Sequence, residues 1–425
     1  MSDGSSETTR LPMPFLAKQH VLFALRHAKF LPTPYQAEDS NRMTLAYFCL
    51  SALALLPSSA VSTVDLDRSA LEVMLKETQK EGYAAWVYEQ QLPKGGFRGS
   101  DAFVGASTSP EPAPSTSAPP AAPPRHAAPQ AMSFSASFSS IDTPHVIQSY
   151  TALLTLALLD DDFSRLNRQG LLDFLGSCQN EDGSFSHFPG CPERPDPRST
   201  YSAFAVASML NDWSTIDVDR ALAFLNSCRR YEGGFAQWPG AEANAGPTYC
   251  AIASFSLASR LSSLPSPERL LRWLVDRQVR PPPPPPPSEP GSDDEEDEEH
   301  EREAAVLREA AGFQGRANKP TDACYSFWNT AALQLLLPAI SPSLRLSDIL
   351  DPALDRAWLL SCQHQLYGGI AREPGALPDV MHHYLSLAAL SLGDAASTLN
   401  LRSLDPAWNL SREVGERIRA RLWRR

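Results

Sequence analysis

Apolar residues recur at helical spacing along most of the chain, in short segments separated by polar or glycine-rich turns. Patterns that alternate between apolar and polar residues, which are typical of strands, are nearly absent. The basic end of the chain, residues 417–425, is expected to form the tail of a surface helix. The sequence therefore predicts an all-α protein, with helices over residues 16–30, 41–56, 145–159, 165–178, 201–210, 218–228, 248–261, 268–278, 324–337, 352–362 and 381–392.

One turn motif occurs three times, as Ser-Cys followed a few residues later by Gly-Ser-Phe, Gly-Gly-Phe or Gly-Gly-Ile. The copies lie at residues 177–185, 227–235 and 361–370, and the first two are about fifty residues apart, the length of a two-helix repeat. Glycine permits a tight reversal between an outer and an inner helix, and the apolar residue after it packs into the turn. The chain is therefore read as an array of helical hairpins, which can stack in an open superhelix or close into a ring. The repeated cysteines are expected to be core thiols: Cys178, Cys228 and Cys362.

Two low-complexity inserts interrupt this array. Residues 107–140 are rich in proline, alanine and serine, and residues 281–303 join a proline run to an acidic run. Such compositions cannot bury enough apolar surface to fold. We therefore expect one domain over residues 1–425 that carries both inserts.

Composition narrows the classes of function. The formal charge of −12 argues against a nucleic-acid or anionic-membrane binder. Seven cysteines without a disulfide-scaffold rhythm suit a reducing compartment. No secretory signal opens the sequence, and no apolar stretch is long enough to span a bilayer. These features predict a soluble, cytoplasmic protein without stable membrane insertion.

Two cations, Arg316 and Lys319, precede a carboxylate, Asp322, and a thiol, Cys324. Cations suit a phosphorylated group, and a carboxylate with a thiol suits zinc, with His382 downstream as a third candidate ligand. Residues two apart on a helix point about 200° away from each other, so one ligand must lie where the helix begins or bends. Spacing alone leaves a second interpretation open, and favours it: a capping carboxylate beside a buried apolar cysteine.

Residues 315–328 read Gly-Arg-Ala-Asn-Lys-Pro-Thr-Asp-Ala-Cys-Tyr-Ser-Phe-Trp, and this run resembles the zinc-site segment of protein prenyltransferase β subunits. The similarity extends through most of the chain outside the inserts. The resemblance implies the closed ring, an α–α barrel (toroid) with a central cavity. It also implies an enzyme that transfers an isoprenoid from its diphosphate to a cysteine thiol near the C-terminus of an acceptor protein. Such β subunits work in an obligate heterodimer with a helical-repeat α subunit.

The resemblance places one zinc ion at Asp322, Cys324 and His382. Zinc with three protein ligands keeps a fourth position for the acceptor thiol, which ionises as it becomes a ligand. Asp379, three residues before His382, is expected to orient the imidazole. His383 is expected to be a packing or surface residue.

The diphosphate-binding positions of the family match Arg316, Lys319 and Tyr325, with Tyr325 also counted among the catalytic residues. Fixed cations and donors there would meet the charge that develops on the leaving diphosphate. Asn244 stands where the family has a histidine. Asparagine can donate a neutral hydrogen bond but cannot carry charge, so this departure weakens the expected diphosphate affinity.

Other positions concern the rest of the substrate site. Arg198 matches a family arginine near the substrates, the alternative being a surface arginine at a helix start. An apolar cavity is needed for the isoprenoid, and Trp328 and Tyr249 are the aromatic residues expected to line it.

Within the family, the chain resembles the geranylgeranyltransferase type I β subunits, which use geranylgeranyl diphosphate and modify C-terminal CaaX motifs, typically with Leu at X, on proteins such as Rho-family small GTPases. Thr44 stands where the farnesyl enzyme has tryptophan, and the smaller side chain leaves room for one more isoprene unit. Arg372 replaces an aspartate that holds magnesium in the farnesyl enzyme, so magnesium is expected not to be required. The alternatives are a farnesyl- or Rab-type β subunit, or a non-catalytic repeat scaffold.

Overall fold

The structure of the chain is a computed structural model that describes residues 13–64, 67–101, 143–279, 312–393 and 395–423. The two predicted inserts, at residues 107–140 and 281–303, lie outside the described residues. Within the described ranges, long helices follow one another as hairpins, each with an outer and an inner member. The outer helices are α1 (Ala17–Lys29), α4 (Glu77–Glu89), α6 (Arg168–Ser177), α8 (Val218–Ser227), α10 (Pro267–Val275) and α13 (Pro352–Ser361). The inner helices are α2 (Arg42–Leu55), α5 (Val146–Leu158), α7 (Pro197–Leu210), α9 (Ala245–Leu257), α12 (Ala323–Ile340) and α14 (Val380–Leu390).

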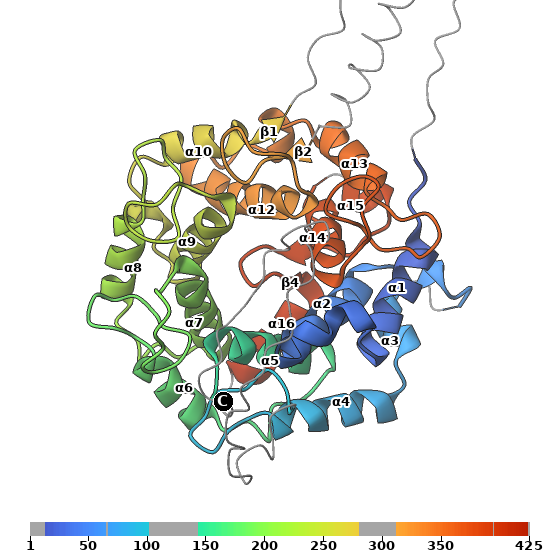
Figure 1. Cartoon of the computed structure of the whole chain (residues 1–425), viewed down its shortest axis with the longest axis horizontal. Helices are drawn as coiled ribbons and strands as arrows, with labels where there is room; N and C mark the ends of the chain where they lie inside the picture. The colour runs from blue at the N-terminus through green and yellow to red at the C-terminus, as the bar shows by residue number, and fades with distance from the viewer. Residues whose placement is uncertain (1–12, 65–66, 102–142, 280–311, 394, 424–425) are drawn as a thin grey trace, which may run out of the picture.

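The inner helices close into a ring. Each contacts the next in the order α2, α5, α7, α9, α12 and α14, and α14 returns to α2 (Figure 1). The outer helices form a second layer around them, as Figure 1 shows. The prediction of an all-α protein and of a closed α–α barrel is confirmed.

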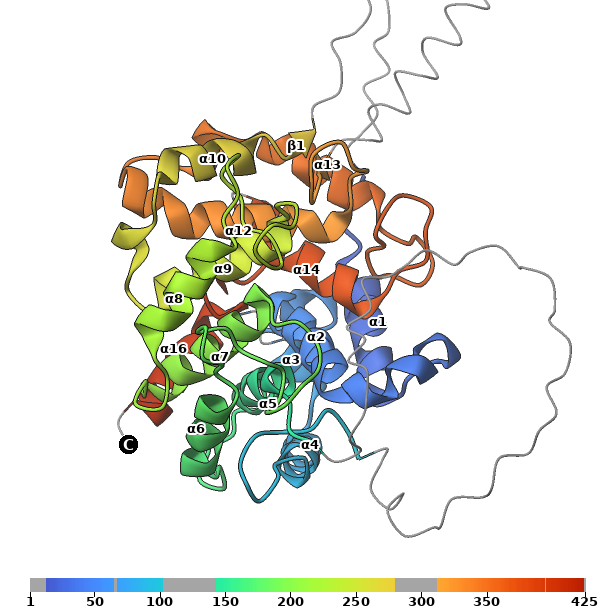
Figure 2. The ribbon, with the colours of Figure 1, turned by 60° about the vertical axis from the view of Figure 1, so that its left-hand side comes forward.

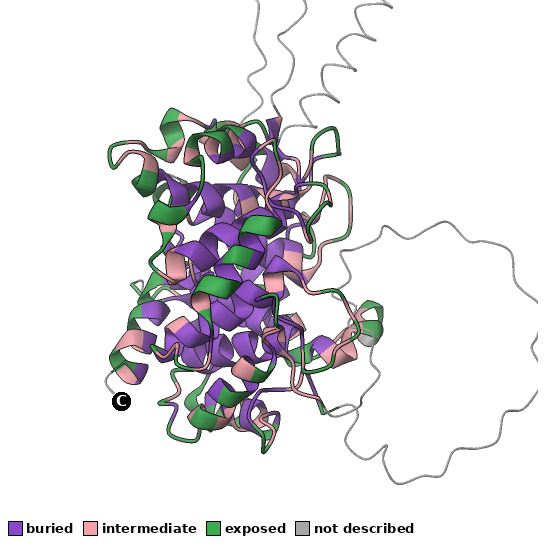
Figure 3. Ribbon diagram, turned by 90° about the vertical axis from the view of Figure 1, so that its left-hand side faces the viewer, coloured by how far each residue is buried: buried purple, intermediate pink, exposed green. Residues whose placement is uncertain are grey.

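The two layers differ in how they bury their side chains. The inner helix α9 is buried from Ala245 through Phe255, because it packs against neighbours on both sides and an outer helix behind. The outer helix α10 buries only one stripe, Leu270, Trp273 and Leu274. Figure 3 shows the result, with buried residues inside and exposed residues on the outer helices. A helix that is apolar on all sides belongs inside, and a striped helix belongs at the surface.

Each copy of the predicted turn motif has a glycine with positive φ and an antiparallel bridge across the turn. Gly183 has φ +89°, and a Cβ atom there would lie 2.1 Å from the carbonyl oxygen of Arg220. An antiparallel bridge then pairs Gln179 with Phe185, whose side chain is fully buried. The repeated cysteines are buried as predicted: Cys178, Cys228 and Cys362.

Shorter elements connect the hairpins and their ends. The single-turn helices are α3 (Ala70–Met74) and α15 (Ala395–Thr398), with 3₁₀ turns at Thr33–Asn41, Ser58–Ala60, Leu261–Ser263 and Leu346–Asp348. In the part of the chain that the structure describes, the strands form two antiparallel pairs, β1 (Gln278–Val279) with β2 (Gly312–Phe313), and β3 (Leu404–Asp405) with β4 (Leu410–Ser411).

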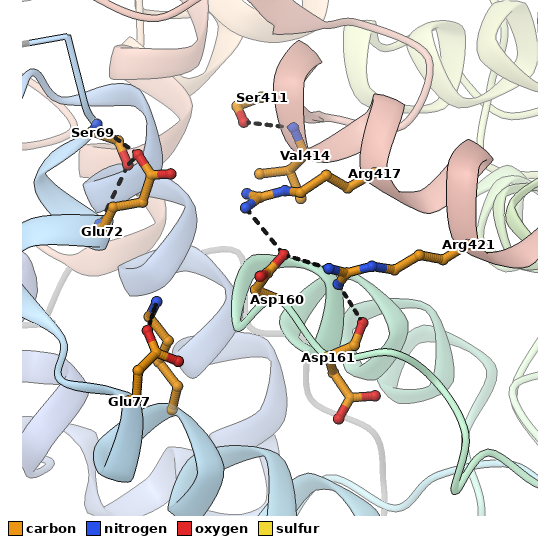
Figure 4. Close-up of polar contacts among 10 residues, drawn as sticks. Ser69, Glu72, Glu77, Asp160, Asp161, Ser411, Val414, Arg417 and Arg421 are labelled. Carbon is orange, nitrogen blue, oxygen red and sulfur yellow. Dashed lines mark hydrogen bonds and ion pairs between the residues drawn. The ribbon is translucent and has the colours of Figure 1, made fainter.

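The C-terminal helix α16 (Arg412–Leu422) differs from the expected surface tail. It buries Val414, Ile418 and Leu422 and packs against α5 and α7, beside which it lies in Figure 2. Arg417 and Arg421 both reach the carboxylate of Asp160 at the end of α5, at 3.2 and 2.9 Å (Figure 4). The expected surface helix is present, but the arginine-rich sequence did not indicate the apolar stripe that attaches it to the barrel.

Candidate functional site

The predicted zinc ligands come from the starts of two neighbouring inner helices. Asp322 is the N-cap residue of α12, and its side chain accepts a hydrogen bond from the backbone N–H of Cys324 at 2.9 Å. Because Asp322 lies just outside the helix, the helical rotation of about 200° between residues two apart does not apply to it. Its side chain can therefore lie on the same side as that of Cys324. His382 lies in the first turn of α14, which packs against α12.

These three side chains converge. One ligand atom from each of Asp322, Cys324 and His382 lies within 4.8 Å of the others, and Asp322 Oδ1 is 3.2 Å from His382 Nε2. The other ring nitrogen, Nδ1 of His382, is 2.5 Å from Asp379 Oδ2. Asp379 is itself fixed as the N-cap residue of α14, where it accepts hydrogen bonds from two backbone N–H groups. The imidazole therefore presents Nε2 to the cluster.

Electrostatics at the cluster are set by burial and by the two carboxylates. Burial raises the pKa of the Cys324 thiol to about 12. Burial also acts to lower the pKa of His382, but hydrogen bonds to Asp322 and Asp379 outweigh it and hold that pKa well above its ordinary value.

The donor set fits zinc. Carboxylate oxygen, thiolate sulfur and imidazole nitrogen are the atoms zinc prefers, and three protein ligands leave a fourth tetrahedral position open. The carboxylate on the far side of His382 is the usual support for a metal-binding imidazole. Magnesium would favour an all-oxygen set, which this cluster does not provide.

A cavity of about 490 Å³ opens inside the ring beside this cluster. Tyr325, next to Cys324 in the chain, lies on its wall, and most of the exposed wall is apolar. Of the residues predicted for substrate binding, the wall includes Thr44, Arg198, Asn244, Arg316, Tyr325 and Trp328. A pocket of this volume with a few polar groups is typical of a small-molecule site.

Three other predicted residues lie outside the lining. Lys319 is solvent-exposed. Arg372 lies with its Nε 3.8 Å from Asp322 Oδ2, next to the predicted zinc cluster. Tyr249 is fully buried behind the wall, where its ring packs 5.2 Å from that of Trp328.

The polar groups of the cavity are held by neighbours. Arg198 is paired with Asp196, the N-cap residue of α7, and Asp196 is buried. Arg316 donates to Glu242 at 3.0 Å. Burial raises the pKa of Tyr325 to about 12, with the Cys324 thiol adding to the shift and a hydrogen bond with Asn244 opposing it, so the phenol is a neutral donor. His383 is buried against the rings of His20 and Phe23, in keeping with the expected packing role.

A regular series of tyrosines on the inner helices was not predicted from the sequence, although one member, Tyr249, was singled out. Inner helices carry a tyrosine five residues after the N-cap residue at 145→150, 196→201, 244→249 and 379→384. Each hydroxyl donates to a backbone carbonyl of residues 406–409, and the Asn409 side chain joins the cavity wall. The repeated spacing was visible in the sequence, but its partner segment was not.

Comparison with known proteins identifies the family from sequence, and a solved structure shares the fold. A family model described as the prenyltransferase alpha-alpha toroid domain matches residues 15–410. The chain belongs to this family. Two prenyltransferase relatives are named geranylgeranyl transferase type-1 subunit beta: one from Dictyostelium discoideum, 34% identical over 92% of this chain and 94% of its own length, and one from Arabidopsis thaliana, 30% identical over 89% and 85%.

More distant prenyltransferases also match. A protein farnesyltransferase subunit beta from Schizosaccharomyces pombe is 26% identical over 91% of this chain and 82% of its own. The solved structure of Candida albicans protein geranylgeranyltransferase-I complexed with GGPP has a TM-score of 0.72 at 24% identity, covering 96% of this chain and 99% of that one. The predicted family, its similarity to type I β subunits and the enzyme class of protein prenyltransferase are confirmed.

In the part of the chain that the structure describes, no helix combines the length and the apolar character that crossing a bilayer requires.

Proposed function

We propose that this chain is the β subunit of a type I protein geranylgeranyltransferase, which transfers geranylgeranyl from its diphosphate to the cysteine thiol of a C-terminal CaaX motif, typically with Leu at X. The observation that carries the proposal is the cluster of Asp322, Cys324 and His382 beside an apolar cavity inside a closed ring. This reaction needs a metal site that can bind the acceptor thiol and an apolar site that can bind the isoprenoid.

In the proposed reaction, the bond between C1 of the isoprenoid and the diphosphate oxygen breaks, and a bond between C1 and the acceptor sulfur forms. The thiol loses its proton to solvent, and diphosphate leaves. Zinc held by Asp322, Cys324 and His382 would supply the Lewis acidity that lowers the pKa of the acceptor thiol. Asp379 orients the imidazole of His382, as its 2.5 Å contact with Nδ1 indicates.

The chain's own polar groups would receive the diphosphate. Arg316 and Tyr325 lie on the cavity wall, and Tyr325 keeps its proton because of burial, so it can donate to a phosphate oxygen. Asn244 lies beside Tyr325 and can add a neutral donor. Lys319 is exposed and would have to turn inward, whereas Arg372 beside Asp322 would supply the resident charge that makes magnesium unnecessary.

The isoprenoid would lie along the apolar wall. Thr44 is on this wall, and its hydroxyl is engaged by Gln148 at 3.0 Å, so it presents a small surface there. Trp328, also on this wall, lies on α12, which α14 separates from the helix of Thr44, α2. These positions support a donor longer than farnesyl diphosphate.

The proposal includes partners and place. The chain would work in an obligate heterodimer with a prenyltransferase α subunit in the cytoplasm, on CaaX proteins such as Rho-family small GTPases. The named relatives support this reading, since type-1 β subunits are by name subunits of a larger enzyme.

The test uses the chain co-purified with its α subunit. Zinc is measured by elemental analysis in the wild type, in Cys324→Ala and in Cys178→Ala, a buried cysteine of a repeat turn that serves as the control. Transfer to a Cys-a-a-Leu peptide is measured with geranylgeranyl and farnesyl diphosphate, with and without magnesium. We expect one zinc per heterodimer, lost only in Cys324→Ala, and a preference for the longer donor without magnesium. Zinc with farnesyl preferred would indicate a farnesyltransferase, and neither zinc nor transfer would indicate a repeat scaffold.

A further inference from the structure

One part of the cavity wall, called the floor below, is formed by residues that do not belong to the inner helices. Residues 406–409, between β3 and β4, lie within the ring, where Figure 1 shows β4. Asn409 lines the same cavity as Thr44 and Tyr325, and among the described residues of the C-terminal segment it is the one on that wall. Asn409 therefore adds to the cavity wall a residue that the repeat itself does not supply.

Five tyrosine hydroxyls hold this segment in order around the ring. Tyr384 of α14 and Tyr47 of α2 both donate to the carbonyl oxygen of Asn409. The next three inner helices donate to the three preceding carbonyls in turn, from Tyr150 to Trp408 at 2.9 Å, from Tyr201 to Ala407 at 3.1 Å and from Tyr249 to Pro406 at 2.9 Å. Buried carbonyls without strand partners require such donors. The floor is thus fixed to nearly every inner helix at once.

Asn409 itself is held in one conformation. Its backbone has φ +53°, a left-handed region in which asparagine is tolerated better than most residues. The Tyr384 hydroxyl, whose one proton is shared between the Asn409 carbonyl and the side-chain Oδ1, lies 2.9 Å from Oδ1, and the residue is 5% exposed. The left-handed backbone and the contact at Oδ1 together restrict the conformation of this side chain at the cavity wall.

The segment is also supported from behind. Trp408 is 1% exposed, donates to the hydroxyl of Ser208 at 3.2 Å and lies under the guanidinium of Arg419 on α16. Arg419 reaches back to Asp405 at 3.0 Å. A shift of residues 405–408 away from the cavity would therefore require α16 to move as well.

We propose that Asn409 is a specificity-determining residue of this prenyltransferase: it is the stop against which the far end of the isoprenoid rests, and it limits the length of the donor from below. The polar residues Arg316 and Tyr325 would hold the diphosphate at the other part of the same cavity. This inference rests on the proposed function. It assigns donor length to two positions, Thr44 on the side wall and Asn409 on the floor.

The test changes the floor and leaves the wall intact. Asn409→Gly keeps the left-handed backbone and deepens the cavity, whereas Asn409→His, also tolerated at this φ, makes it shallower. Asn400→Gly is the matched control, because Asn400 has the same φ of +53° and is exposed far from the cavity wall. Each heterodimer is assayed for kcat/KM with farnesyl, geranylgeranyl and geranylfarnesyl diphosphate, and for zinc content and melting temperature.

Relative to geranylgeranyl diphosphate, Asn409→Gly is expected to improve use of the geranylfarnesyl donor by at least about tenfold. Asn409→His is expected to favour farnesyl diphosphate by a similar factor, and Asn400→Gly to leave all ratios unchanged. Tyr384→Phe removes the hydroxyl that holds the Asn409 side chain and provides a second variant in case a floor variant does not fold. It is expected to shift the donor preference toward the longer donor by a smaller factor.

Two failures are distinguishable. A wild type that transfers geranylgeranyl while no floor variant changes the donor ratios would overturn the role of Asn409 alone. A wild type that neither binds nor transfers any of the three donors would remove the proposed function and this inference with it.

Discussion

Asp379 performs two tasks with one carboxylate: it caps α14 through backbone N–H groups and holds Nδ1 of His382. Asn at this position keeps the capping oxygen but loses the charge that supports the imidazole. We expect Asp379→Asn to weaken zinc binding by about 10–100-fold with little loss of stability, measured by competition with a chromophoric chelator. The control is Asp351→Asn, since Asp351 caps α13 away from the cluster. Equal zinc affinity in both variants would show that Asp379 acts as a cap only.

The metal cluster was predicted better than the substrate cations. Spacing alone favoured a capping carboxylate beside a buried cysteine, and the resemblance to prenyltransferases placed Asp322 and Cys324 as zinc ligands. The N-cap position of Asp322 explains how the two side chains can converge. Arg372 and Lys319 were less predictable, because a long flexible side chain is placed by its neighbours. Arg372 lies beside Asp322, which no spacing in the sequence indicates.

Two turn glycines allow the cost of backbone strain to be compared with the cost of a steric clash. Gly183 and Gly190 both have positive φ, but a Cβ atom at Gly183 would overlap the Arg220 carbonyl, whereas nothing lies within 4 Å at Gly190. We expect Gly190→Ala to cost about 1–2 kcal/mol of unfolding free energy, which is the price of the left-handed backbone. Gly183→Ala should cost about 3 kcal/mol or more. Chemical denaturation of both variants checks this, and equal losses would mean that the turn yields to the added methyl.

Asp355 on α13 is a half-buried carboxylate that accepts a hydrogen bond from the Ser326 hydroxyl of α12 at 2.6 Å. Burial raises its pKa to about 7, above the ordinary value near 4. The folded state therefore holds this proton more tightly than the unfolded state, so the contribution to stability is full below pH 4 and is lost as the pH rises to 7.

Asp355→Asn should accordingly raise stability at pH 8 by about 1–2 kcal/mol and flatten the fall in stability between pH 4 and 7. Thermal melts across that range are the measurement. Asp173→Asn, at an exposed helical carboxylate on α6, is the control and should change neither. A steeper fall in Asp355→Asn than in the wild type would contradict the assignment.

The sequence predicted the repeating elements and missed the irregular ones. Every predicted hairpin turn with its glycine and apolar residue is present, because the motif encodes a local conformation that needs no distant partner. Helix α4 was not predicted, since it contains Gly82 and its apolar residues are consecutive rather than at helical spacing; it packs on α5. The attachment of helix α16 was not predicted because its arginines obscure an apolar stripe that finds its partners about 250 residues earlier in the chain, as the Arg417–Asp160 separation of 257 shows.

Across the whole molecule, apolar packing rather than charge should hold α16 on the barrel. The pairs of Arg417 and Arg421 with Asp160 are partly exposed, and such pairs contribute about 1 kcal/mol or less (Figure 4). Ile418 is fully buried, so Ile418→Ala should cost about 2–5 kcal/mol, against at most about 1 for Asp160→Ala. Urea unfolding of the two variants decides this, and a larger loss in Asp160→Ala would show that the ion pairs are the main attachment.

Closure of the ring has a kinetic consequence. An open solenoid can fold outward from any repeat, but here α2 must meet α14, and Tyr47 contacts Tyr384 across 337 residues of sequence. The entropy of closing so long a loop grows only logarithmically, so the equilibrium suffers little, whereas folding rates fall steeply with the sequence separation of native contacts. The last helices to be synthesised thus complete the first, and until they do, the apolar inner face of α2 remains exposed to water.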